Sequence, residues 1–134
     1  MVLNSNERVT HLQDVWVDVL TPITANHQVD MDHWVTHLKT LSFKGIRRFV
    51  LFGKCGEGEC FSGDTKIAVL KALLTEGWSP EQLVLGIQGS ASQDVVRQLQ
   101  SAYALGLRQF LVTPPAHQHP VQANGLVSYF QGLV

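Results

Sequence analysis

The sequence predicts a parallel α/β fold in which strands and helices alternate along the chain. Short segments rich in valine and leucine start near residues 15, 49, 83 and 110. Each is followed by apolar residues at the i, i+3, i+4 spacing of a one-faced helix. Gly45, Gly77 and Gly106 each stand between a predicted helix and the next strand, where helices commonly end. Four such units of about 30 residues have the size of a βαβ step and imply a parallel sheet.

The first two units show this pattern in detail. Asp14–Leu20 alternates and is rich in valine, which predicts a strand. Asp30 can cap a helix whose apolar stripe is Met31, Trp34, Val35, Leu38 and Leu41. Phe49–Phe52 is a continuous apolar run, as expected of a parallel strand buried on both faces. We expect the second helix from about Asp64 to Glu76.

The third and fourth units repeat the order. Leu83–Ile87 predicts the third strand, and Ser90 or Ser92 is expected to cap the helix that follows it. Phe110–Thr113 predicts the fourth strand. A last helix is expected near Val121 to Leu133, with Leu126, Tyr129, Phe130 and Leu133 on one face.

Composition narrows the possible function classes. The 134 residues are 45% hydrophobic and 16% charged, as in one globular domain. A formal net charge of -1 and the lack of a basic cluster argue against a nucleic-acid partner. The apolar runs are far shorter than the roughly 18 residues of a membrane span. The polar N-terminal stretch Met1–Gln13 lacks the apolar core of a secretory signal, so we expect a cytoplasmic protein.

Two architectures fit four strand–helix units. One is a complete, doubly wound sheet of the flavodoxin type, and the other is half of a TIM barrel, which normally needs about 250 residues. Periodicity alone does not choose between them. In both, function is located at the C-terminal ends of the strands. The loops of interest are therefore residues 21–28, 53–62, 88–92 and 114–120.

The glycine-rich loop, Gly53–Glu59, is the most informative of these. Glycines after a buried strand let backbone N–H groups approach an anion, and the next helix adds its N-terminal dipole. The order of its residues does not match a P-loop, and the two glutamates would repel a polyphosphate. A small carboxylate fits better. A plain tight turn is the alternative, and glycine content does not decide between the two.

Histidines offer a second set of candidates. His117 and His119 follow the fourth strand, and histidine suits proton transfer near neutral pH. Solvent-exposed loop histidines are the simpler interpretation of this pair. His33 and His37 have the i, i+4 spacing of a zinc-binding helix, but the intervening Glu of that motif is absent. We expect no metal site and no cofactor.

Taken in order, the loops resemble one family. The motifs that carry the resemblance span about residues 15–133: Leu20-Thr21-Pro22-Ile23, Val29-Asp30, Leu51-Phe52-Gly53-Lys54-Cys55-Gly56-Glu57-Gly58, Gly86-Ile87-Gln88-Gly89, Val112-Thr113-Pro114-Pro115 and Gly125-Leu126. Singly each is weak, but together they resemble the dihydrodipicolinate synthase / N-acetylneuraminate lyase family.

This resemblance implies that residues 1–134 form one partial domain, the N-terminal half of a TIM (β/α)8 barrel with four parallel βα units. It also implies a carbon–carbon lyase of the class I aldolase type, in which a lysine forms a Schiff base with pyruvate or a related 2-oxo acid. The family holds the substrate carboxylate with the loop that is here Gly53, Lys54, Cys55, Gly56 and Glu57. His117 stands at the position of an aromatic residue that helps to relay protons.

The chain also departs from the family pattern. Lys54 and Cys55 replace two hydroxyl residues. The family's tyrosine proton carrier and Schiff-base lysine belong to the fifth and sixth strands, which these 134 residues do not include. We therefore expect the chain alone to be inactive, and to form a homo-oligomer or to need a C-terminal half. The remaining alternative is a non-catalytic module that binds a carboxylate or serves assembly.

Overall fold

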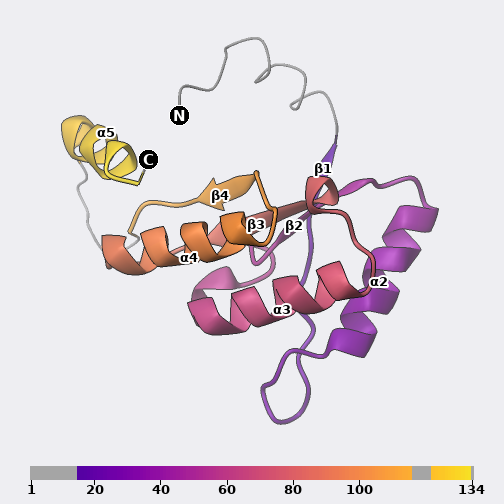
Figure 1. Cartoon of the computed structure of the whole chain (residues 1–134). Coiled ribbons are helices and arrows are strands. Elements are labelled where there is room, and N and C mark those ends of the chain that lie inside the picture. The colour runs from indigo at the N-terminus through magenta and orange to yellow at the C-terminus, as the bar shows by residue number, and fades with distance from the viewer. Residues whose placement is uncertain (1–14, 116–121, 134) are drawn as a thin grey trace.

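The computed structural model describes residues 15–115 and 122–133 and contains a four-stranded parallel sheet (Figure 1). Its strands pair in chain order, β1-β2-β3-β4. They are β1 (Trp16–Asp18), β2 (Arg48–Leu51), β3 (Leu83–Ile87) and β4 (Phe110–Val112). A doubly wound sheet would place the first strand between the others, so the flavodoxin-type alternative is wrong. The order is that of half a TIM barrel.

A helix follows each strand, as the sequence predicted. They are α2 (Met31–Phe43), α3 (Gly63–Thr75), α4 (Ser92–Ala104) and α5 (Ala123–Gln131), with short 3-10 turns η1 (Gly58–Cys60) and η2 (Pro80–Gln82). Figure 1 shows α3 and α4 side by side in front of the sheet, whereas α5 stands apart from it beyond β4.

Several helix ends follow the predicted local chemistry. The Asp30 side chain accepts a hydrogen bond from the His33 N–H at 3.1 Å and caps α2, and this bond lowers the pKa of the Asp30 carboxyl. Gly45, Gly77 and Gly106 all have φ between +95° and +98°, as their predicted role as helix stops requires.

The predicted cap of α4 is wrong. Ala91 occupies the N-cap position and has no side-chain oxygen to offer, while Ser92 is already the first helical residue. The outer strands are also shorter than predicted. Of the predicted strand Asp14–Leu20, the described residues form a strand at Trp16–Asp18, because a strand needs a neighbour in register.

The core lies between the sheet and the helices. Alternation along the strands turns Phe49, Leu51 and Leu85 toward α2, α3 and α4, where all three are fully buried. The row formed by Asp18, Val50 and Val84 is in register and points to the opposite side, which we call the open face. Val50 and Val84 are not part of the helix-side core cluster. The open face is the side that would line the interior of a closed barrel.

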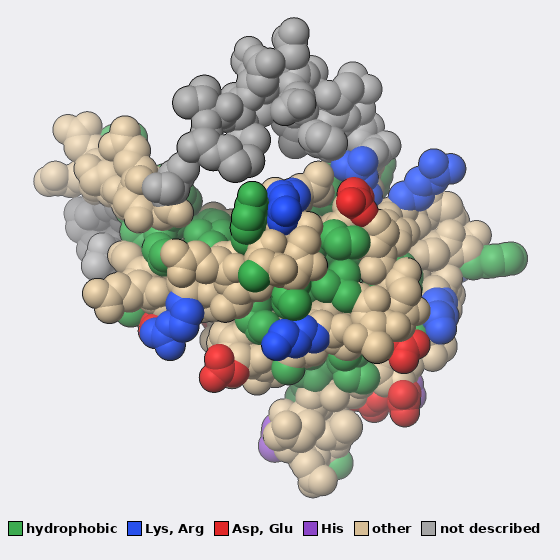
Figure 2. Space-filling view, viewed as in Figure 1, with side chains coloured by type: hydrophobic (Ala, Val, Ile, Leu, Met, Phe, Trp, Pro, Cys, Tyr) green, Lys and Arg blue, Asp and Glu red, His purple; other side chains and the backbone are tan. Residues whose placement is uncertain are grey.

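The two sheet edges expose apolar side chains. Val15 is 73% exposed, Leu20 65% and Leu111 40%, and no residue of α5 is buried. In the view of Figure 2, acidic and basic side chains are dispersed and form no patch of one sign. No helix in the described part of the chain is long and apolar enough to cross a membrane.

Candidate functional site

The glycine-rich loop leaves β2 in a tightly closed turn. Phe52 and Glu57 adopt positive φ angles of 55° and 51°. The Gly58 N–H donates to the Gly53 carbonyl at 3.0 Å and closes the turn. A Cβ atom on Gly58 would overlap the Phe52 carbonyl oxygen, so this position requires glycine.

The loop after β1 holds this turn from the other side. The Thr21 hydroxyl donates to the Gly56 carbonyl at 2.8 Å across 35 positions of sequence. A Cβ on Gly56 would come within 2.7 Å of the Val19 carbonyl oxygen. The Thr-Pro turn and the glycine-rich loop therefore pack as one unit at the C-terminal edge of β1 and β2.

A carboxylate already lies against the backbone of the glycine-rich loop. Asp18 Oδ2 accepts a hydrogen bond from the Cys55 N–H at 2.9 Å. The Asp18 side chain also fills the space beside Gly53, where an added Cβ would overlap the carboxylate. The other oxygen, Oδ1, is buried and accepts no hydrogen bond from the described residues. The loop can thus receive a carboxylate, and the carboxylate present belongs to the chain itself.

A buried lysine forms hydrogen bonds to the end of β3 and to the loop that follows it. Lys66 is only 1% exposed, and its Nζ donates to the Gly86 carbonyl at 3.2 Å and to Gln88 Oε1 at 2.6 Å. Gln88 in turn donates from Nε2 to the Phe52 carbonyl at 2.9 Å. Burial lowers the pKa of the Lys66 ammonium to about 8, although the Glu59 carboxylate partly opposes this shift. These bonds join α3 to the ends of β2 and β3.

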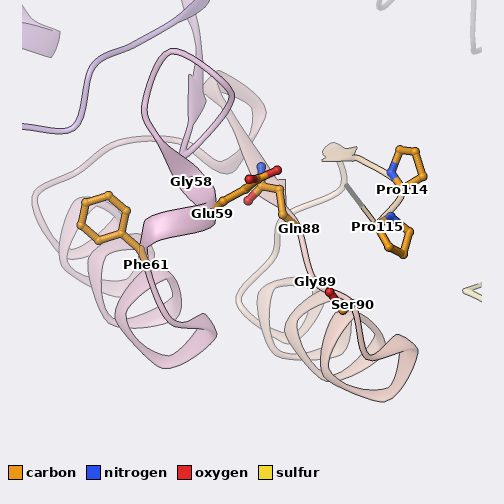
Figure 3. Close-up of a pocket in the computed structure, with 8 residues that line it drawn as sticks. All are labelled: Gly58, Glu59, Phe61, Gln88, Gly89, Ser90, Pro114 and Pro115. Atoms are coloured by element: carbon orange, nitrogen blue, oxygen red, sulfur yellow. The ribbon is translucent and has the colours of Figure 1, made fainter. Parts of the chain in front are cut away.

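A cavity of about 150 Å³ opens above this network (Figure 3). Glu59 and Gln88 come into it from two different loops, with Pro114 and Pro115 across the gap. Among the described residues of its lining, the charged side chain is that of Glu59, whose carboxylate would repel a carboxylate ligand.

A second cavity, of about 550 Å³, lies between the Thr-Pro turn, α2 and the glycine-rich loop. Its lining includes His33, His37, Cys55 and Glu57. His33 Nδ1 lies 2.8 Å from Asp30 Oδ2, so this ring is already paired with the cap of its own helix. No group of three or more His, Cys, Asp or Glu residues in the described chain could hold a metal ion.

The predicted substrate-binding residues do lie together in one loop. Gly53 and Gly56 are buried, whereas Lys54, Cys55 and Glu57 are exposed. The predicted proton relay His117 lies outside the described residues, as does His119.

Sequence reasoning missed two residues of the site. The first residue is Asp18. An acidic residue within an alternating, valine-rich strand is unusual, and this pattern could have marked Asp18 as a site residue. The second residue is Lys66, whose amine reaches the end of β3. Lys66 shares the i, i+3, i+4, i+7 stripe of α3 with the buried residues Val69, Leu70 and Leu73, which marks it as inward-facing.

Comparisons with known proteins agree with this architecture. The chain is 26% identical over 122 residues to the 4-hydroxy-tetrahydrodipicolinate synthase of Xanthomonas campestris, covering 91% of this chain and 40% of the relative. The crystal structure of dihydrodipicolinate synthase from Agrobacterium tumefaciens matches with a TM-score of 0.85 and 26% identity, over 90% of this chain and 42% of that one.

A third match concerns the fold alone. YagE, a prophage protein of the dihydrodipicolinic acid synthase family from E. coli K12 solved with pyruvate, has a TM-score of 0.81 and 19% identity over 90% of this chain and 40% of that one. No protein-family model matches the chain. The chain spans about 40% of the length of the relatives it matches.

Proposed function

Since this chain resembles the N-terminal half of the dihydrodipicolinate synthase family over 91% of its length, we propose that it forms one partial-barrel domain, residues 1–134, of a Schiff-base lyase. The substrate is pyruvate or a related 2-oxo acid. The observation that carries this proposal is the Cys55 N–H, which donates to a carboxylate at 2.9 Å. The relative YagE was solved in complex with pyruvate, a ligand with the same functional group.

In this proposal the glycine-rich loop binds the acid end of the substrate. Backbone N–H groups of residues 53–57 hold the carboxylate, and the ketone carbon points toward the interior of the closed barrel. A neutral lysine amine from outside the 134 residues attacks that carbon, and loss of water leaves the Schiff base. His117, which follows the fourth strand in the sequence, serves as a proton relay.

The lysines of this chain are unsuited to replace the missing amine. Lys54 is exposed and belongs to the loop that binds the acid end of the substrate in this proposal, so its amine adjoins the carboxylate and not the ketone. Lys66 has the lowered pKa that a nucleophile needs. However, Lys66 is only 1% exposed and its Nζ points to the Gly86 carbonyl and Gln88 Oε1, so the amine is withdrawn from an incoming ketone. The 134-residue chain alone is therefore inactive.

Borohydride reduction in saturating pyruvate, followed by intact mass and peptide mapping, tests the proposal. The chain alone gives no adduct. A folded fusion of this chain to strands five to eight of a dihydrodipicolinate synthase gives one adduct, on the lysine of the added half. A stoichiometric adduct on Lys54 or Lys66 of the chain alone would make it a self-contained enzyme. A cooperatively melting fusion that traps no pyruvate would remove the lyase proposal.

The exposed edges of the sheet are the reason to propose a protein partner. β1 and β4 are each paired on one side within the described chain, and unpaired edges beside exposed apolar side chains favour association. The partner is a second copy of this chain or a C-terminal half. Light scattering at micromolar concentration tests this, and a monomer with a cooperative melting transition would contradict it.

A non-catalytic carboxylate-binding module is the second candidate. The observation that favours it is the Cys55 N–H, which donates to a carboxylate without any contribution from further strands of a barrel. The trapping experiment separates the two candidates, because a binding module gives no adduct even when the second half of the barrel is supplied.

A further inference from the structure

Asp18 combines three features that the proposed lyase chemistry does not use. It extends from the open face of β1, its Oδ2 accepts the Cys55 N–H at 2.9 Å, and its Oδ1 is buried with no hydrogen bond from the described residues. A side chain placed on the open face for solubility would keep both oxygens hydrated. One carboxylate oxygen is instead desolvated so that the other can reach a backbone donor 37 positions away.

The surroundings of Asp18 are shaped to admit this carboxylate. Gly53 has no side chain where any Cβ would overlap the Asp18 carboxyl group. The loop that carries Cys55 is closed by its own hydrogen bond from Gly58 to Gly53 and is held by Thr21. The donor is therefore fixed in place, and it is the Asp18 side chain that reaches it.

An external carboxylate would need the same donor. If the glycine-rich loop binds a 2-oxo acid through its backbone, as in the proposed function on which this inference rests, the acid meets Asp18 at the Cys55 N–H. Two carboxylates at one donor repel each other and compete for one hydrogen bond. We propose that Asp18 is the specificity-determining residue of this site: its carboxylate fills the loop from within and excludes external carboxylates until it is displaced.

Replacement of Asp18 tests occupancy directly. In the 15N-labelled chain, pyruvate titrations of the wild type, Asp18→Ala and Asp18→Ser are followed at the Cys55 amide, with sodium chloride as the reference for ionic strength. Both shortened side chains vacate the donor, and two such variants guard against failure of one to fold. We expect each to bind pyruvate at least about tenfold more tightly than the wild type, a difference of about 1.4 kcal/mol.

Two controls separate occupancy from charge. Asp18→Asn removes the charge but keeps a side-chain oxygen of the same reach, so it stays in the loop and binds pyruvate more weakly than Asp18→Ala. Asp32→Ala makes the same change in net charge as Asp18→Ala at an exposed position in the first turn of α2. It leaves pyruvate binding at the wild-type level.

The outcomes distinguish this inference from the proposed function. Equal affinity of the wild type and Asp18→Ala, with the shift at Cys55, shows an open site: the role of Asp18 is then wrong and the carboxylate site stands. If neither folded protein responds to pyruvate beyond the chloride reference, the carboxylate site itself is wrong, and exclusion by Asp18 is overturned with it. If Asp18→Asn binds as tightly as Asp18→Ala, charge alone acts and occupancy is overturned.

Discussion

The β3 strand and the β4 strand are neighbours in one sheet, yet they differ sharply in environment. All five residues of β3 are buried, whereas β4 has two half-buried residues and one exposed residue. β3 has a paired strand on each side and helices over its outer face, while β4 is paired only with β3 in the described chain. Burial here follows the position of the strand in the sheet and not its hydrophobicity, because both strands consist of apolar residues apart from Gly86.

The helices repeat the contrast. α3 buries Lys66, Val69, Leu70 and Leu73, and α4 buries Val95 and Ala102, but α5 buries none of its residues. The buried residues of the core cluster therefore all precede β4 in the described chain. In the proposed barrel, the fourth unit becomes buried, and so contributes to stability, only when another strand pairs with β4.

Removal of the same side chain from the two strands gives the largest expected effect. Leu85 on β3 is fully buried, so Leu85→Ala should cost roughly 3 kcal/mol of unfolding free energy, from lost burial and the cavity left behind. Leu111 on β4 is 40% exposed, and Leu111→Ala should cost less than about 1 kcal/mol. Urea denaturation measures both, and equal costs would show that β4 is already as well packed as β3.

The buried lysine gives an effect of intermediate size. Its pKa is lowered from 10.5 to about 8 in the folded chain. Between these pH values the unfolded chain binds more protons, so the unfolding free energy should rise with pH, by at most about 3 kcal/mol. Below about pH 8 the full cost of burying the ammonium is present. Lys66→Met should remove this rise.

Lys71→Met is the matched control, because Lys71 lies on the same helix and is exposed. It should keep the wild-type pH dependence measured by urea denaturation between pH 7 and about pH 10.5. A rise that persists in Lys66→Met would assign the titration to another group.

Helix caps give the smallest effect. The Ser62 hydroxyl accepts the Thr65 N–H at 3.1 Å and caps α3, so Ser62→Ala should cost about 1 kcal/mol. Ala91 lies at the uncapped start of α4 in an extended conformation, and Ala91→Ser should gain about 0.5–1 kcal/mol. Thermal melts of the two variants provide the measurement. No gain from Ala91→Ser would mean that the first turn of α4 has its N–H groups satisfied in another way.

Local sequence was sufficient for the order and type of the elements. β3 was predicted at its observed bounds, because a continuous apolar run between a turn and a glycine admits few alternatives. Asp30 and the three glycines marked helix ends correctly, since capping and positive φ are properties of single residues. The cap of α4 was misplaced because two serines two positions apart, Ser90 and Ser92, both suit an N-cap, and only the fold decides where the first turn begins.

The site was predictable in part, for a related reason. Glycine content and position after a buried strand indicated residues 53–59 as a loop of interest. No local pattern shows which side chain contacts the backbone of this loop. The contacts of Asp18 with Cys55 and of Lys66 with Gln88 join residues 37 and 22 positions apart. They depend on the pairing of β1 with β2 and of β2 with β3, so a shift of one residue would turn Asp18 to the other face.

The sequence by itself determined four βα units, their glycine stops and a tight glycine-rich turn after β2, because each depends on the intrinsic preferences of neighbouring residues. Periodicity left the strand order open, whereas the family resemblance implied half a TIM barrel, and the observed order 1-2-3-4 confirms it. Only the tertiary structure decided that the Lys66 amine is buried beneath Gln88 and that the Asp18 carboxylate lies on the Cys55 N–H. The physical reason is that strand register and side-chain burial are set by packing between segments distant in sequence, which the preferences of neighbouring residues do not encode.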